Sequence, residues 1–76
     1  MSAKSKLLWR CRRGVKELDV ILTRYLESEY DDSNAVDKQL FEKLLEYQDP
    51  DILHFFLKIK EPEDEEIARI VEKIRK

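Results

Sequence analysis

The sequence predicts an all-α fold, a small five-helix bundle that forms a single helical domain over residues 1–76, and three observations lead to this prediction. Hydrophobic residues make up 42% of the chain, which is too many for a disordered protein. One glycine and two prolines are too few turn residues for a β-sandwich. The apolar residues recur three and four positions apart, which is the spacing of amphipathic helices.

The first helix is predicted over residues 6–12, with Ser5 as its N-cap. Gly14 is expected to end it in the left-handed conformation, with Arg12 and Arg13 in the last turn. A second helix is predicted over residues 15–29. Because the apolar spacing continues in phase through the glycine, one long helix kinked at Gly14 is the alternative to a break. The apolar residues in phase are Leu7, Cys11, Val15, Leu18 and Leu22.

The first residues of the other three helices carry recognisable signals. Asn34 is predicted to cap the third helix, with Asp37 at the capping-box position three residues later. Asp49 and Pro50 predict an N-cap and a first helical residue for a fourth helix, which reaches about residue 58. Pro62 is expected to begin the fifth helix in the same way. The apolar faces predicted for the third and fourth helices are Val36, Leu40, Phe41, Leu44 and Leu45, then Ile52, Leu53, Phe55, Phe56 and Leu57.

Size and charge narrow the classes of function. A chain of 76 residues has little room for a substrate cleft beside its core, so we expect a binding module and not an enzyme. Residues 1–16 are basic, but because the whole chain has a net charge of −2 we expect no nucleic-acid partner. A single cysteine, no signal peptide and no long apolar run predict a cytoplasmic protein without membrane insertion.

Histidine and cysteine often bind metals or take part in catalysis, but both are predicted to be structural residues here. One histidine and one cysteine cannot supply the ligands of a zinc site, so no metal is expected. Cys11 lies on the apolar side of its helix, which predicts a small core residue and not a nucleophile. His54 lies among large apolar residues and is predicted to be a packed or half-exposed structural histidine.

The segment WRCRRGVKELD, residues 9–19, holds the only tryptophan, cysteine and glycine of the chain. On a near-helical backbone Arg13 would point away from the apolar side and share a solvent-facing patch with Gly14 and Glu17. Trp9 would also face away from the core. Tryptophan and arginine dominate binding hot spots, and glycine allows close approach. The alternative is a turn glycine with a weak Arg13–Glu17 pair, and the pattern alone leaves both interpretations open.

The same segment resembles the signature of the succinate dehydrogenase flavinylation factors, the SdhE-type proteins of bacteria and the mitochondrial assembly factor 2. Their shared motif Arg-Gly-x-x-Glu falls on Arg13, Gly14 and Glu17. The stretch LLEYQDPDIL, residues 44–53, is similar to the second block of the family, and the resemblance covers about residues 7–75. Many bacterial members have tryptophan where this chain has two phenylalanines. The flanking residues that also follow the family pattern are Trp9, Cys11, Arg12, Leu18 and Asp19.

The resemblance implies an assembly factor that binds the flavoprotein subunit of succinate dehydrogenase, and in some bacteria that of fumarate reductase. It implies that the chain promotes covalent attachment of FAD to a histidine of that subunit, with FAD carried by the partner and direct FAD contact left open. An antitoxin of a toxin–antitoxin pair is the alternative function. A nucleic-acid-binding module using residues 4–16 is a third, and it predicts steeply salt-dependent binding. The implied partner-binding residues are Arg13, Gly14, Glu17, Trp9, Arg12 and Asp19.

Overall fold

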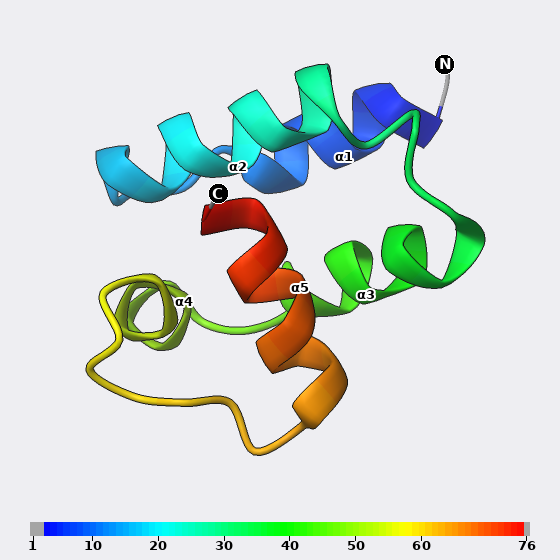
Figure 1. The fold of residues 1–76 in the computed structure, drawn as a ribbon. Coiled ribbons are helices and arrows are strands. Elements are labelled where there is room, and N and C mark those ends of the chain that lie inside the picture. The colour runs from blue at the N-terminus through cyan, green and yellow to red at the C-terminus, as the bar shows by residue number, and fades with distance from the viewer. Residues whose placement is uncertain (1–2, 76) are drawn as a thin grey trace.

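Five helices make up the fold in the computed structural model, which describes residues 3–75 (Figure 1). Over that range the chain contains no strand, so the predicted all-α five-helix bundle is confirmed. None of the helices within it is both long and apolar enough to cross a membrane. The helices are α1 (Ala3–Cys11), α2 (Lys16–Ser28), α3 (Ala35–Leu44), α4 (Asp49–Phe56) and α5 (Glu65–Arg75).

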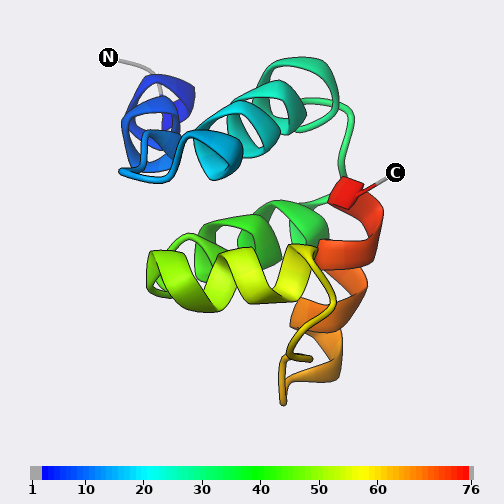
Figure 2. The same ribbon diagram turned by 90° about the vertical axis from the view of Figure 1, so that its left-hand side faces the viewer.

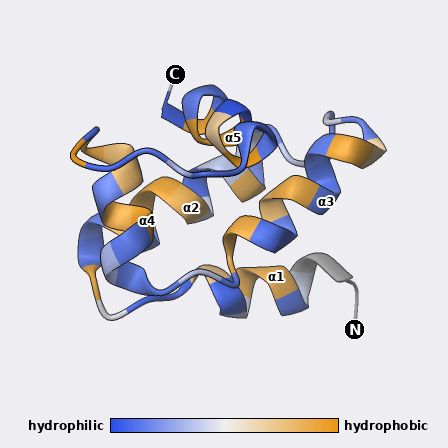
Figure 3. Ribbon diagram, turned by 90° about the horizontal axis from the view of Figure 1, so that it is seen from below, coloured by the Kyte–Doolittle hydropathy of each residue, from blue (hydrophilic) through white to orange (hydrophobic). Residues whose placement is uncertain are grey.

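Helices α1 and α2 form an antiparallel hairpin that lies across the other three helices (Figures 1 and 2). Helix α5 packs against α2, α3 and α4, so it joins the hairpin to the rest of the molecule. In Figure 3 the connecting segments are mostly hydrophilic, while hydrophobic stretches of the helices turn towards the interior. The fully buried centre of the core contains Cys11, Leu18, Leu22, Phe41, Leu44, Ile52, Ile67 and Ile70.

The helical conformation is interrupted between α1 and α2, which confirms the predicted break and not the alternative of one long kinked helix. Two details of the prediction were wrong. The helix begins at Ala3, so Ser5 lies inside it and is not its N-cap; alanine and lysine are strong helix formers and extend the helix backwards. It ends at Cys11, where the Arg12 amide donates to the Trp9 carbonyl at 3.2 Å, and Gly14 does not have a positive φ.

Helix α2 agrees with its prediction to within one residue at each end. Val15 precedes it in an extended conformation, with φ −90° and ψ 114°. Glu17 and Asp19 lie in the first turn, where negative charge is favoured by the helix dipole. Its buried face consists of Leu18, Leu22, Tyr25 and Leu26, as the apolar spacing indicates.

Helix α3 begins as predicted, because the Asn34 side chain accepts a hydrogen bond of 2.8 Å from the Asp37 amide. The carboxylate of Asp37 does not complete the capping box. It is buried and accepts from Arg69 at 3.1 Å and from Lys73 at 2.5 Å, both on α5. Val36 was predicted to belong to the apolar face, but it is 50% exposed.

The beginnings of α4 and α5 differ from the prediction. Asp49 is the first residue of α4 and Gln48 precedes it as the N-cap, because the Asp49 carboxylate pairs with Arg13. Helix α5 begins at Glu65, not at Pro62, and the Asp64 carboxylate caps it by accepting from the Glu66 amide at 2.9 Å.

Helix α4 also ends earlier than predicted. Lys58 adopts a left-handed conformation with φ 61°, and the amide of Ile59 donates back to the His54 carbonyl at 3.0 Å. These two features form a Schellman helix end, with lysine where glycine or asparagine is usual. As a result Leu57, predicted to lie on the apolar face, is 58% exposed.

The buried Asp37 carboxylate is expected to make stability depend on acid pH. The hydrogen bond from Lys73 lowers its pKa, so its stabilising contribution is present above the ordinary carboxyl pKa of about 4 and is lost as the pH falls through the lowered value. Since both cations are half-exposed, Asp37→Asn should lower the free energy of unfolding by about 1–2 kcal/mol at pH 7. Urea unfolding at pH 7 and pH 2–3, with the exposed Asp32→Asn as control, measures this. A difference from wild type that persists at the lower pH would contradict the assignment.

Candidate partner-binding site

The residues predicted to bind a partner separate into an exposed group and a buried one. Trp9, near the end of α1, is 70% exposed, as predicted. The guanidinium carbon of Arg12 lies 5.7 Å from the centre of the Trp9 ring, within the range of a cation–π contact. Together they present a flat aromatic surface and a positive charge to solvent. Both residue types are common at the centre of protein–protein interfaces.

Gly14 lies in the connection between α1 and α2 and is exposed. A Cβ atom added at this position would meet nothing within 4 Å, and the backbone does not require a positive φ. The fold therefore gives no reason for glycine at this position. If glycine is needed here, the reason must be the approach of another molecule.

The two acidic residues predicted for the site differ in exposure. Glu17, in the first turn of α2, is exposed beside Gly14. Asp19 is half-buried, and its carboxylate accepts a hydrogen bond of 3.3 Å from the Thr23 hydroxyl. Glu17 is thus available to a partner, while Asp19 is already engaged within α2.

Arg13 does not lie in the exposed patch, so its predicted orientation was wrong. Its side chain is only 15% exposed and reaches the connection between α3 and α4. It donates to the Leu45 carbonyl, to the Tyr47 carbonyl at 3.4 Å and to the Asp49 carboxylate at 3.2 Å. The prediction assumed a helical backbone through residues 12–15, but the helix ends at Cys11 and the direction of the side chain changes.

Arginines from the hairpin satisfy carbonyl groups at the end of α3. The last carbonyls of a helix have no partner within the helix, and the helix dipole favours a cation beside them. Arg10 donates to the Glu42 carbonyl at 3.0 Å, and Arg13 donates to the Leu45 carbonyl. These bonds join residues at least 32 positions apart, so no local pattern in the sequence could reveal them.

Cys11 and His54 have the structural positions that were predicted. Cys11 is fully buried, and burial raises the pKa of its thiol to about 11, against the opposing charges of Arg13 and Arg10. His54 is half-buried on α4. Between residues 3 and 75, no three side chains of histidine, cysteine or acid come together as a metal site.

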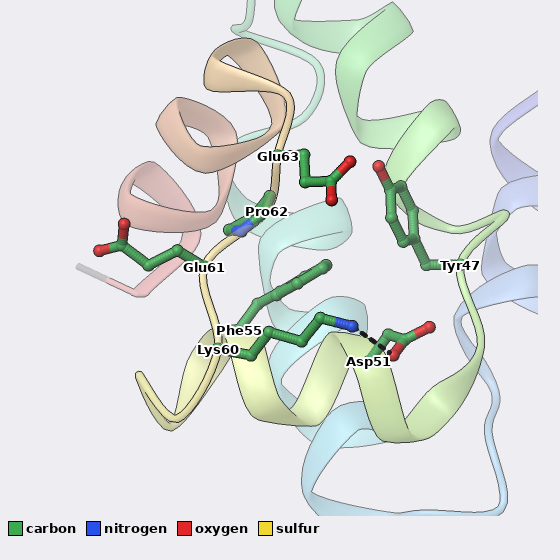
Figure 4. A pocket seen from close by; sticks show the side chains of 7 residues that line it. All are labelled: Tyr47, Asp51, Phe55, Lys60, Glu61, Pro62 and Glu63. Atoms are coloured by element: carbon green, nitrogen blue, oxygen red, sulfur yellow. Dashed lines mark hydrogen bonds and ion pairs between the residues drawn. The ribbon is translucent and has the colours of Figure 1, made fainter.

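A hollow of about 270 Å³ is lined by residues of the α3–α4 connection, of α4 and of the α4–α5 connection (Figure 4). Lys60 pairs with Asp51 at 3.3 Å along one side, and Tyr47 and Glu63 lie at the other side. Phe55 lies between them and contacts the Tyr47 ring edge-on, with 5.5 Å between ring centres. None of the predicted site residues lines this hollow, and its lysine is already paired with an aspartate of the chain.

The fold and the exposed patch define a small all-helical protein whose candidate site is an open surface. The chain belongs to the family described as the flavinator of succinate dehydrogenase, whose model matches residues 5–76. This confirms the resemblance carried by residues 9–19 and 44–53.

Several proteins are similar in sequence to this chain over most of its length. It is 39% identical over 72 residues to the FAD assembly factor SdhE of Pectobacterium atrosepticum, covering 95% of this chain and 82% of the relative. The protein of the same name from Methylococcus capsulatus is 39% identical over 75 residues, covering 99% and 90%. The one from Acinetobacter baylyi is 36% identical over 70 residues, covering 92% and 82%. The similarity therefore spans α1 to α5.

Proposed function

We propose that this chain binds the flavoprotein subunit of succinate dehydrogenase and promotes covalent attachment of FAD to a histidine of that subunit. The observation that carries the proposal is the family match over residues 5–76. Relatives named FAD assembly factor, similar over nearly the whole chain, support it. The proposal extends to the flavoprotein subunit of fumarate reductase as a second partner and to the cytoplasm as the place of action.

The contact surface in this proposal is the exposed patch of Trp9, Arg12, Gly14 and Glu17. Glycine permits the backbone of the partner to approach closely, and the two charged groups form charge-assisted hydrogen bonds with it. Arg13 acts differently. Because its guanidinium is bound to the α3–α4 connection, it positions the exposed residues and does not contact the partner.

The chain acts in this proposal as a helper and not as an enzyme. The histidine and the flavin both belong to the partner, so the chain contributes by holding them in a reactive arrangement, which raises their effective concentration. FAD remains on the partner and is not held stably by this chain. The hollow beside Glu17, about 340 Å³, is lined by residues of one helix only and suits a contact surface better than an enclosed cofactor site.

Covalent flavin fluorescence tests the proposal directly. The flavoprotein subunit would be incubated with FAD, with and without this chain, then denatured and read for flavin signal in the gel. We expect a strong signal only when the chain is present. Equal signal in both lanes would separate this protein from the reaction and favour the antitoxin function.

A further inference from the structure

The outer face of α2 continues the exposed patch away from Gly14. Glu17, Val20, Ile21 and Arg24 are spaced i, i+3, i+4 and i+7, so they lie on one side of the helix. Val20 is 55% exposed, and Ile21 is only partly buried. The inner face of α2 is already filled by other residues, so the core gives no reason for an apolar Val20.

Two hollows along this face share one residue. The first, about 340 Å³, is lined by Lys16, Glu17, Val20 and Ile21. The second, about 200 Å³, lies where α2 meets the ends of α4 and α5. Because Ile21 lines both, they form one continuous strip, on the side of the molecule where α2 lies above α4 in Figure 2. The second hollow is lined by Ile21, Arg24, Phe56, Ile74 and Arg75.

The charges around the strip are unevenly placed. At the far end, Arg24 and Arg75 stand beside the apolar side chains of Phe56 and Ile74. Arg75 is fixed there, because its Nε donates to the Phe56 carbonyl at 3.0 Å and its Nη1 donates to the Glu72 carboxylate at 3.2 and 3.3 Å. Two arginines and one paired glutamate leave this end of the strip positively charged. An apolar floor beside the Arg24 guanidinium fits an apolar side chain followed by a carboxylate, since arginine binds carboxylates in a defined geometry.

A stable interface also needs a larger contact area than the patch around Gly14 offers. A typical specific interface buries roughly 800 Å² on each partner. That is about a sixth of the 5168 Å² exposed by this chain. The strip extends the contact by about 10 Å from Glu17 to Arg24, at 1.5 Å per residue.

We propose that the strip along α2 is the continuation of the partner-binding surface and accepts a segment of the flavoprotein subunit in which an apolar residue is followed by an acidic one. This inference rests on the proposed function. The apolar residue covers Val20 and Ile21, and the carboxylate lies between Arg24 and Arg75.

Titration of the purified flavoprotein subunit with variants of the full chain tests this inference. Val20→Asp and Arg24→Glu are each expected to weaken binding at least about tenfold, because a charge is placed on the apolar contact or reversed at its far end. Val36→Asp is the matched control, since Val36 is 50% exposed on α3 and lies outside both hollows. It should bind as wild type. Circular dichroism should be unchanged in all three.

The outcomes separate this inference from the proposed function. If Val20→Asp and Arg24→Glu bind as wild type while Gly14→Arg does not, the strip is not part of the interface, and the function stands without it. If the Val36→Asp control weakens binding as much, the effect of added charge is not local and the inference is overturned. If the unmodified chain does not bind the subunit, both proposals fail together.

Discussion

Replacing Gly14 by arginine is expected to abolish covalent flavin attachment while leaving the fold intact. The Cβ atom of the added side chain would lie more than 4 Å from the other atoms considered around it, and Gly14 does not have the positive φ that L-residues avoid. On the solvent side, a long charged side chain would prevent the close approach proposed for the partner. We expect flavin fluorescence in the gel to fall to the level without the chain, and helical circular dichroism to match wild type.

Gly14→Ala serves as the graded control for this prediction. Alanine removes backbone freedom from the unfolded chain, so it should leave stability unchanged or raise it by about 0.4–1 kcal/mol. Its single methyl group should reduce flavin attachment less than arginine does. Loss of fold together with loss of signal in Gly14→Arg would support a structural turn glycine. Full activity in Gly14→Arg would remove Gly14 from the contact surface.

The second large effect is expected for Arg13→Ala, and it should fall on stability. Truncation removes three hydrogen bonds to the α3–α4 connection and leaves the half-buried Asp49 carboxylate without this partner. Loss of a partly buried, charge-assisted contact of this kind costs about 2–4 kcal/mol. A domain of this size has roughly 4–11 kcal/mol of total stability, so the loss would be large. Chemical unfolding monitored by circular dichroism measures it.

Two neighbouring variants make the Arg13 experiment specific. Arg12→Ala removes an exposed arginine and should change stability by less than about 0.5 kcal/mol. Arg13→Lys keeps the positive charge, but an ammonium group cannot bind several acceptors at once as the planar guanidinium does. This variant should therefore be more stable than Arg13→Ala and less stable than wild type. If Arg13→Ala proved as stable as wild type but inactive in flavin attachment, Arg13 would contact the partner directly, as the sequence indicated.

Most of the fold could be predicted because its signals are local. The spacing of apolar residues predicts five helices in the right order, and Asn34 caps α3 as expected. The two helix starts predicted from proline were less exact. Asp49 pairs with Arg13 instead of capping α4, and Pro62 lies three residues before α5. Such signals show that a helix begins nearby, but tertiary contacts decide the first residue.

The candidate site was predicted less completely than the fold. Exposure of Trp9 and burial of Cys11 follow from the position of each residue on a regular helix. The direction of Arg13 could not follow from it, because residues 12–15 are not helical and its acceptors lie 32 to 36 positions away. The position on a regular helix thus predicted the exposure of Trp9 correctly, whereas the predicted direction of Arg13 was wrong.

The burial of Cys11 has a practical consequence for following how the molecule opens. A thiol with a pKa of about 11 is ionised in roughly one molecule in ten thousand at pH 7, and this one is also shielded from solvent. An alkylating reagent can therefore modify it only after the core around the end of α1 opens. Because it is the only cysteine, the alkylation rate of the unaltered chain reports how often this part of the core opens, without any added probe.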